Sequence, residues 1–321
     1  MTFKAVVIGL GQIGMGYDLK HDPSFYVLSH SRAFQKHPSY ELISGCDPDV
    51  KKKKIFETEY ECTAYSKVED VLINHNPDII AVAVPTDQHH CTIEKIFNNS
   101  KPRAILCEKP LSFDLEESKK IIKLCKDHNC RLYVNYMRRS DPGTLEIREK
   151  LSNGDIQGPV KGIVWYSKGV FNNGSHFFNL LQSVLGNPVN YSMLNEGRLW
   201  NNFDPEPDFT VHFEHGTVVF LAAVEENFSH YTIELIARNG RLRYEMGGKK
   251  IHWEKVVSDT VYAGYSILNK EVEDIISDMD RCQYNVVQEI FNDLKGKEAS
   301  ICTGEDAYKT IKFLYKMVNN S

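Results

Sequence analysis

The first 140 residues alternate short apolar runs with amphipathic segments, and these two patterns predict buried strands and helices. The strands are expected at Lys4–Ile8, Leu42–Cys46, Asp78–Val84, Ala104–Cys107 and Leu132–Asn135. The helices between them are expected at Ser66–Asn74, Thr92–Asn98 and Leu115–His128. Alternation of this kind is typical of a parallel sheet with helices on both faces. We therefore predict an α/β domain over residues 1–140.

The pattern changes after Asp141-Pro142-Gly143, where one helix at Leu145–Leu151 precedes segments of alternating polarity separated by turns such as Asn239-Gly240. These segments predict strands at Val160–Ser167, Phe209–Phe213, Thr217–Val224, Thr232–Ala237, Leu242–Glu245 and Ile251–Val256. Two amphipathic helices, Tyr284–Leu294 and Asp306–Met317, close the chain. The second domain, residues 141–321, is thus predicted to be α+β with an open, mostly antiparallel sheet.

Composition narrows the class of protein. The 321 residues carry a formal net charge of −5, so no basic field would attract nucleic acid. No apolar run approaches the roughly 18 residues that a membrane span needs, and the run after Lys4 is too short for a signal-peptide core. Eight cysteines occur without a C-x-x-C pair, so we expect reduced thiols in a cytoplasmic protein, without disulfides or a metal site.

A glycine-rich turn, Gly9-Leu10-Gly11-Gln12-Ile13-Gly14, follows the first predicted strand directly. In a strand–turn–helix context such glycines permit a tight turn, let the backbone approach a pyrophosphate and place it at a helix N-terminus. We predict that this turn, including Gln12 and Ile13, binds a dinucleotide and opens a helix. The alternative interpretation is an ordinary glycine turn.

Asp47 ends the second predicted strand, where a carboxylate can accept hydrogen bonds from both hydroxyls of an adenosine ribose and repel a 2′-phosphate. NAD is therefore favoured over NADP, unless Asp47 only forms a turn with Pro48. Asp47 lies 33 residues beyond Gly14, whereas about 20 is usual. We interpret the additional residues, from Met15 to about Leu28, as an insertion at the mouth of the site.

Two more strand ends carry candidate cofactor contacts. The third strand continues into Pro85, Thr86 and His89, and the next strand continues into Glu108-Lys109-Pro110. In an open parallel sheet ligands bind beyond the carboxyl ends of the strands, which makes these side chains candidates for the cofactor site. For Thr86, a helix N-cap is an equally good interpretation.

Together these motifs resemble the glucose–fructose oxidoreductase / inositol dehydrogenase / MocA (Gfo/Idh/MocA) family, whose pattern combines the glycine turn, a Pro-Thr-x-x-His strand end and Glu-Lys-Pro. Three further segments are similar to the same family, namely Asn135–Pro142, Gly169–Leu181 and Thr303–Ala307. The resemblance therefore covers nearly the whole chain. It implies a Rossmann NAD-binding domain (1–140) and a second domain (141–321) for substrate binding and oligomerisation.

The resemblance also implies roles for individual residues. Lys109 maps onto the family's catalytic lysine, with a cis Lys109–Pro110 peptide, and His176 maps onto its acid/base histidine. Asn172 and Asn179 stand where many members carry aspartate, and we expect both at the substrate, with Asn172 on the same helical face as His176.

Two arginines, Arg138 and Arg139, lie in the segment that resembles the family's domain crossover. They are candidates to bind a phosphate or carboxylate of the substrate. Alternatively, one of them pairs with Asp141 or Glu146.

These side chains suit alcohol oxidation. Hydride transfer from a secondary alcohol needs a base for the hydroxyl proton and a donor for the developing oxyanion. An imidazole such as that of His176 titrates near neutrality, and Lys109 can donate a hydrogen bond to the same oxygen. Asparagine cannot take a proton, so the acid/base chemistry falls on these two residues. The plainer alternatives are a surface lysine and a structural histidine.

We therefore expect an NAD(H)-dependent oxidoreductase, with NADP less favoured, that acts on a secondary alcohol or ketone of a sugar. The pattern Asn-x-x-x-His-Phe-Phe is similar to the branch that oxidises carbon 3 of nucleotide-linked sugars in surface-polysaccharide biosynthesis. The expected partners are a small sugar substrate and further copies of the chain, as a dimer or tetramer. Three alternatives stay open: NAD-dependent glycosidase-type chemistry, an inositol or free-sugar dehydrogenase, and a non-catalytic NAD-binding regulator.

Overall fold

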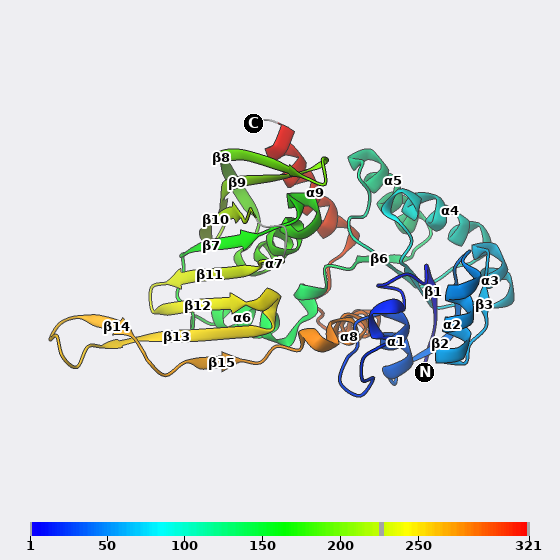
Figure 1. Ribbon diagram of the computed structural model, residues 1–321, viewed down its shortest axis with the longest axis horizontal. Helices are drawn as coiled ribbons and strands as arrows, with labels where there is room; N and C mark the ends of the chain where they lie inside the picture. Colours follow the sequence, from blue (N-terminus) through cyan, green and yellow to red (C-terminus); the bar gives the residue numbers. More distant parts are fainter. Residues whose placement is uncertain (1, 225–227, 320–321) are drawn as a thin grey trace. The chain divides into compact units, whose positions relative to one another are not determined.

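The computed structural model describes residues 2–224 and 228–319. The chain forms two compact units (Figure 1). The first contains the residues up to Ser140 together with Asp280–Lys309, and the second contains Asp141–Met279 and the residues from Thr310 onwards. The change of unit at Ser140 lies at the predicted boundary. The prediction of an uninterrupted second domain is wrong for residues 280–309, which return to the first unit.

The first unit is built on a six-stranded sheet in the order β3-β2-β1-β4-β5-β6, in which all paired strands are parallel. Its strands are β1 (Phe3–Ile8), β2 (Tyr40–Cys46), β3 (Ala64–Tyr65), β4 (Ile79–Val82), β5 (Ala104–Cys107) and β6 (Arg131–Val134). The predicted parallel sheet is confirmed. The sequence pattern missed β3 because a two-residue strand is too short to show a period.

Helices cover both faces of this sheet. The main helices are α1 (His30–Lys36), α2 (Val50–Tyr60), α3 (Val68–Asn74), α4 (His89–Asn99), α5 (Leu115–Asp127) and α8 (Cys282–Leu294). One face packs against apolar residues of α1, α2 and α8, and the other packs against α3, α4 and α5. Val286, Val287 and Ile290 of α8 are fully buried in the first of these cores. Burial of that apolar stripe explains why residues 280–309 belong to the first unit.

The first helix of this unit is split. The amides of His30 and Ser31 donate to the carbonyls of Ile13 and Gly14, both at 3.0 Å. In a continuous α-helix residues 17 and 18 would donate to these carbonyls, so the chain re-enters the helix about 13 residues late. This offset equals the excess of the observed spacing of 33 over the usual value of about 20.

Asp18 closes the inserted segment. Its side chain is 1% exposed, and its two carboxylate oxygens accept hydrogen bonds from the amides of Leu28 and Ser29, each at 2.7 Å. The glycine turn was predicted to open a helix, but it opens only a single turn, followed by a 3₁₀ segment at Gly16–Asp18. The insertion is therefore an ordered loop anchored on one buried carboxylate.

The second unit is built on a nine-stranded sheet in the order β14-β13-β12-β11-β7-β10-β9-β8, with β15 also paired to β13 (Figure 1). Its strands are β7 (Val160–Tyr166), β8 (Pro188–Trp200), β9 (Asp204–Phe213), β10 (Gly216–Ala222), β11 (Thr232–Ala237), β12 (Gly240–Glu245), β13 (Lys250–Ser258), β14 (Ser266–Leu268) and β15 (Glu273–Ile275). The pairs are antiparallel except β7 with β10, which confirms the predicted mostly antiparallel sheet.

Helices pack on one face of this second sheet. They are α6 (Pro142–Ser152), α7 (Ser175–Leu185) and the end of α9 (Gly304–Asn319), which supply buried residues such as Ile147, Phe178 and Leu314. Side chains on the opposite face are partly exposed, including Ile163 (40%), Trp165 (38%) and Ile236 (47%). The second sheet is therefore covered on one face and has an open face.

Candidate cofactor and active site

The glycine turn after β1 has the geometry of a cradle. A Cβ on Gly9, whose φ is +98°, would lie 2.5 Å from the backbone of Ala83, and one on Gly14 would lie 1.9 Å from the Gly9 carbonyl oxygen. A Cβ on Gly11 would meet nothing within 4 Å. Gly9 therefore forms the tight turn, Gly14 allows close packing, and Gly11 presents its backbone to open space. These are the three roles that the glycines of a dinucleotide-binding turn perform, so the residues fit such a cofactor.

The rest of the turn surrounds this cradle. Gln12 is exposed and Ile13 is partly exposed, so both lie at the surface where a cofactor contact was predicted.

Asp47 follows β2 beside the glycine turn, as predicted, but its carboxylate is occupied within the chain. Oδ2 accepts from the Leu10 amide at 2.9 Å and lies 3.3 Å from Lys52 Nζ, and Oδ1 accepts from the Asp49 amide at 2.9 Å. The residue is 5% exposed. Asp47 thus ties the glycine turn to the start of α2, which is the turn-forming role that was the alternative interpretation.

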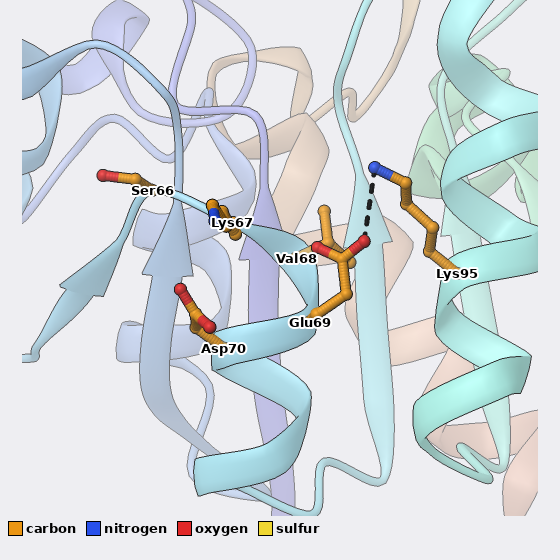
Figure 2. A pocket seen from close by; sticks show the side chains of 6 residues that line it. All are labelled: Ser66, Lys67, Val68, Glu69, Asp70 and Lys95. Atoms are coloured by element: carbon orange, nitrogen blue, oxygen red, sulfur yellow. Dashed lines mark ion pairs between the residues drawn. The ribbon is translucent and has the colours of Figure 1, made fainter.

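An open pocket of about 550 Å³ lies after β3, around the start of α3 (Figure 2). It is lined by Ser66, Lys67, Val68, Glu69, Asp70 and Lys95. The Asp47 amide donates to the Tyr65 carbonyl at 3.1 Å, which places Asp47 next to Ser66. The Glu69 carboxylate pairs with Lys95 Nζ at 3.3 Å, and this pair joins α3 to α4. The pocket therefore adjoins the end of the site where an adenosine ribose was predicted.

The segment after β4 brings three candidates to the carboxyl edge of the sheet. Pro85 is exposed and Thr86 is partly exposed as the first residue of a 3₁₀ turn. Gln88, rather than Thr86, occupies the N-cap of α4, so the N-cap interpretation of Thr86 is wrong. Pro85 and Thr86 both have exposed surface at this edge, and their contact with a cofactor stays a prediction.

His89 was predicted to contact the cofactor, but it is fully buried. Its ring nitrogens lie 3.1 Å from the carbonyl oxygens of Leu111 and Val84, and burial lowers the pKa of the imidazole although these contacts act in the opposite direction. The ring bridges the two loops that follow β4 and β5. The prediction for His89 is corrected, because a fully buried side chain has no surface with which to contact a cofactor. Its role is to join the two loops at the carboxyl edge of the sheet.

Glu108, which directly precedes Lys109, is held by two side chains. His30 Nε2 lies 2.8 Å from Glu108 Oε1, and the Asn135 amide donates to the same oxygen at 2.7 Å. Burial alone would raise the pKa of Glu108, but the hydrogen bonds from His30 and Asn135 and the charges of His30 and Lys109 together leave the pKa below its usual value. Glu108 was predicted to bind the cofactor, whereas the structure uses its carboxylate to anchor the strand end that carries Lys109.

Lys109 itself is partly exposed, and the Lys109–Pro110 peptide is cis, as the family resemblance implied. Its place directly after β5 puts it at the carboxyl edge of the sheet, where ligands of such sheets bind.

In the second unit, Asn172 lies in a π-helical turn, Gly169–Gly174, rather than in the predicted α-helix. Asp204, which is 2% exposed, holds this turn by accepting from the amides of Phe171 at 3.0 Å and Asn172 at 2.8 Å. The side-chain amide of Asn172 donates to the Lys168 carbonyl at 3.2 Å. π-helical turns are rare and often occur at functional sites, so this turn is a candidate for substrate contact.

A second carboxylate supports the same turn. Glu206, also 2% exposed, accepts from the amides of Lys168 at 2.6 Å and Gly169 at 3.3 Å, and it pairs with Arg198 at 2.8 Å. Two acidic residues of β9 therefore fix the backbone that precedes α7.

His176 is the second residue of α7 and is 8% exposed. The next predicted substrate ligand on this helix, Asn179, is fully buried, and its amide donates to Thr310 Oγ1 at 2.9 Å. Thr310 in turn donates to Gln182 at 2.9 Å. The prediction for Asn179 is corrected, because this hydrogen-bond chain joins α7 to α9 in the interior of the unit.

The two arginines of the crossover segment differ. Arg138 is partly exposed, whereas Arg139 is 7% exposed and pairs with Asp306 at 3.1 Å. The Arg139 carbonyl also accepts from the Ser300 hydroxyl at 3.0 Å. Arg139 therefore holds the returning segment 280–309 on the first unit. We correct its assignment as a substrate ligand, because the guanidinium is nearly buried and pairs with Asp306.

Sequence reasoning missed His30, and it treated Asp204 as a substrate-facing candidate in a polar loop, whereas Asp204 begins β9 and supports the site from a buried position. The 13-residue offset could have identified His30, because in an uninterrupted helix it would stand three residues beyond Gly14. No local signal marks Asp204, since its hydrogen-bond partners lie more than 30 residues earlier in the chain.

The parallel sheet, its helices and the glycine cradle define a Rossmann-type dinucleotide-binding protein. Residues 3–136 match the family GFO_IDH_MocA, described as an oxidoreductase family with an NAD-binding Rossmann fold. The match is confined to the first unit, where it supports an NAD-binding Rossmann fold.

Two curated relatives are similar over part of their length. The inositol 2-dehydrogenase of Rhizobium meliloti is 24% identical over 200 residues, which cover 58% of this chain and 56% of the relative. The scyllo-inositol 2-dehydrogenase (NAD(+)) of Bacillus subtilis is 30% identical over 214 residues, which cover 62% of this chain and 58% of the relative. The chain thus matches less than two thirds of either relative.

A solved structure extends the likeness to both units. The WlbA dehydrogenase from Bordetella pertussis, in complex with NADH and UDP-GlcNAcA, has a TM-score of 0.74 and 16% identity, and covers 99% of this chain and 96% of its own. Likeness at this identity shows the fold, which is the predicted combination of a Rossmann domain and an open-sheet domain.

Two structural features are absent from the described residues, 2–224 and 228–319. Within them, none of the helices is both long and apolar enough to cross a membrane. In the same residues, no group of three or more His, Cys, Asp or Glu side chains is arranged to hold a metal ion.

Proposed function

We propose that this protein is an NAD(H)-dependent oxidoreductase that interconverts a secondary alcohol and a ketone of a sugar linked to a nucleotide. The observation that carries the proposal is the carboxyl edge of the parallel sheet in the first unit. Gly11, whose backbone faces open space, follows β1, and Lys109 follows β5 of the same sheet, next to Glu108, which His30 contacts. The bound nicotinamide supplies the hydride acceptor or donor. The Gly9–Gly14 turn, which Asp47 holds in place through the Leu10 amide, is proposed to bind the cofactor together with Pro85 and Thr86.

Lys109 is proposed to donate a hydrogen bond to the substrate oxygen and to stabilise it as negative charge develops there. The His30–Glu108–Asn135 contacts fix the residue before Lys109, so the ammonium group starts from a defined backbone position. His176 is proposed to take the hydroxyl proton in oxidation and return it in reduction. Asn172 and Arg138 are proposed to position the substrate. These roles fit a lysine at a strand end and a histidine near a helix start.

The substrate class rests on two observations. The Asn172–His176 spacing follows the pattern of the sugar-nucleotide branch. The WlbA complex has the same fold, and it was solved with a nucleotide sugar, UDP-GlcNAcA. We place the reaction among those that modify nucleotide sugars for surface polysaccharides, in a reducing cytoplasm that suits the eight free cysteines.

A free cyclitol or sugar is the second candidate substrate. The two relatives named above are both inositol dehydrogenases, which favours this candidate.

We also propose that the protein is a homo-oligomer, dimer or tetramer, which pairs through the open face of the second sheet. Ile163, Trp165 and Ile236 expose apolar surface there, and clustered exposed apolar surface marks association sites.

The decisive experiment compares the wild type with Lys109→Ala. NADH formation is followed by absorbance against UDP-linked sugars, free sugars and inositols, and cofactor affinity is followed by NADH fluorescence. We expect kcat/KM to fall about 10²–10⁴-fold, while the Kd for NADH changes less than about twofold. The exposed Lys54→Ala serves as the matched control and should match the wild type in both measurements. Full activity of Lys109→Ala would refute the assigned role, and NADH binding without turnover of any substrate would favour a regulator.

A further inference from the structure

The hairpin formed by β13 and β14 extends beyond the rest of the second sheet. β13 pairs with β12 as far as Lys255, and from Val256 onwards its strand partner is β14. In Figure 1 this part of the hairpin reaches past the ends of β11 and β12 and away from α6 and α7. We call residues 256–268 the arm. Among the described residues, the apolar core of the second unit includes Trp253 and Ile275 but no residue of the arm.

The arm is apolar on both faces. Successive residues of a strand point to opposite faces, so Val256 and its cross-strand partner Leu268 lie on one face, and Val257 and Ile267 lie on the other. Val256 and Ile267 are each 40% exposed. Apolar residues on both faces are typical of strands that are buried on both faces, and an isolated two-stranded hairpin is at best marginally stable in water. The arm thus has the side chains of a buried hairpin, but its own unit does not bury them.

The tip of the arm adds two aromatic side chains. Asp259 Oδ1 accepts from the amides of Val261 at 2.7 Å and Tyr262 at 3.1 Å, and the Asp259 amide donates to the Tyr265 carbonyl at 2.9 Å, which closes the turn. The ring centroids of Tyr262 and Tyr265 lie 6.4 Å apart, and these residues are 67% and 70% exposed. At about 150–250 Å² per aromatic side chain, the two rings present on the order of 300 Å² to solvent. Contiguous apolar surface of this size marks an association site.

β14 also leaves the edge of the sheet unprotected. It is the last strand in the order of the sheet, so its outer edge meets no further strand among the described residues. Natural proteins commonly protect such edges with lysine, proline or other charged residues. Ser266-Ile267-Leu268 contains none of these, and residues 260–269 carry no charged side chain. An edge of this kind can pair with a strand of another chain.

One face of the arm continues the open face of the second sheet. Ile236 lies opposite Arg241, and Arg241 lies opposite Glu254, so the three share a face. Val256 stands two residues after Glu254 and therefore lies on that face as well. The two rings at the tip supply about a third of the roughly 800 Å² per partner that a stable interface buries. The open face, with side chains such as Trp165, adds to this area.

We propose that the arm docks on a second copy of this chain, so that its two apolar faces, its aromatic tip and the edge of β14 are buried between subunits. The inference rests on the homo-oligomer of the proposed function and names the segment that joins the copies. A second copy is the partner that fits, because the arm continues the face through which we propose that copies pair. An uncharged strand edge is also complementary to an identical edge, as a two-fold interface requires.

The test measures the mass of the full-length protein by light scattering. We expect a multiple of the mass of one chain for the wild type and half of that mass or less for Tyr265→Glu, because the variant places a charge in an apolar contact. Its circular dichroism should equal that of the wild type, since Tyr265 is 70% exposed in its own chain. Ile73→Glu changes a 72% exposed apolar residue of α3 and should keep the wild-type mass.

Hydrogen exchange of the backbone amides tests the burial of the arm directly. In the oligomeric wild type the amides of residues 256–268 should exchange at least about tenfold more slowly than in Tyr265→Glu, because hydrogen bonding and burial at an interface protect them. Ile73→Glu should show the slow exchange of the wild type.

The outcomes separate the arm from the rest of the proposed function. Equal mass, or equal exchange of the arm, in wild type and Tyr265→Glu would overturn the inference, and the proposed pairing through the open face would stand if Ile236→Lys lowers the mass. A wild type with the mass of one chain at every concentration would overturn both. Binding of such a single chain to phosphatidylcholine vesicles, lost in Tyr265→Glu, would overturn the inference by assigning the arm to a lipid surface.

Discussion

The two sheets of this protein present their candidate residues in different ways. The parallel sheet is covered by helices on both faces, and its candidate residues follow directly where β1, β2, β4 and β5 end. The mixed sheet is covered on one face, and its candidates lie on a π-helical turn and the start of α7. In the first unit the backbone of the sheet sets the position of the site. In the second unit buried side chains set it.

This difference predicts different sensitivities to substitution. The glycine turn depends on local backbone space that a Cβ on Gly9 or Gly14 would occupy. The π-helical turn depends on the carboxylates of Asp204 and Glu206, which reach it from another strand. A site built on the main chain should fail at glycines, and a site built on side-chain hydrogen bonds should fail at their acceptors.

The largest effect is expected for Gly14→Ala, because its Cβ would lie 1.9 Å from the Gly9 carbonyl oxygen. We expect NADH binding to be lost and the first unit to be destabilised by about 3 kcal/mol or more, as for other severe steric strain. Gly11→Ala is the matched control: its Cβ meets no atom within 4 Å, so urea unfolding should be unchanged while the Kd for NADH rises. Equal unfolding curves for both variants would contradict the assignment of the glycine roles.

The next effect is expected for Asp204→Ala, which removes the acceptor from the Phe171 and Asn172 amides. Each buried amide left without an acceptor costs about 1–3 kcal/mol, so the second unit should unfold at lower urea. Turnover should fall because the π-helical turn loosens, while fluorescence titration should show wild-type NADH affinity. Glu196→Gln, exposed on β8, should behave as wild type. Loss of NADH affinity in Asp204→Ala would show that the second unit also contributes to cofactor binding, contrary to our proposal.

Two buried histidines should make the stability of the first unit depend on pH. Burial lowers the pKa of His89 and of His37 below the usual 6.5. The unfolded chain therefore takes up protons below about pH 6.5 that the folded chain does not, so stability falls as pH decreases from about 6.5. We expect the free energy of unfolding, measured with urea, to be lower at pH 5.5 than at pH 7. His89→Gln should reduce this slope, and an unchanged slope would exclude His89 as its source.

The smallest effect on folding is expected on the open face. Ile236→Lys should change the free energy of unfolding by no more than about 0.5 kcal/mol, because the side chain is 47% exposed. By contrast, Leu235→Ala, at the neighbouring residue that is 3% exposed on the covered face, should lower the free energy of unfolding by about 2–5 kcal/mol. If the open face joins copies of the chain, light scattering of Ile236→Lys should show a lower mass than wild type. An unchanged mass would place the interface elsewhere.

Much of the fold could be predicted from local pattern. Ile79–Val82 forms one uninterrupted buried run, as a strand covered on both faces requires, and the alternation in β10 places Val218 and Phe220 in the core. The strand β8 was missed because few of its side chains are buried, which leaves no apolar period to detect.

The candidate residues, too, were predicted correctly where a local pattern marks them and wrongly where a distant partner decides their role. The glycine turn and Lys109 were identified because strand ends in a parallel sheet share one edge, whatever the rest of the chain does. Asn179, Arg139 and His89 were misassigned because each is buried against a partner that lies elsewhere in the sequence. For Asn179 that partner is Thr310, and for Arg139 it is Asp306.

The sequence alone determined the parallel sheet, the glycine cradle, the placement of Lys109 at a strand end and the family resemblance, because each strand, turn or motif behind them is defined by neighbouring residues. Only the tertiary structure decided that the first helix is split, that residues 280–309 complete the first core, and that Asp204 and Asp47 are held inside the protein. These features depend on contacts between residues far apart along the chain. A local pattern shows which side chains are apolar or polar, but it does not show which distant partner each of them meets.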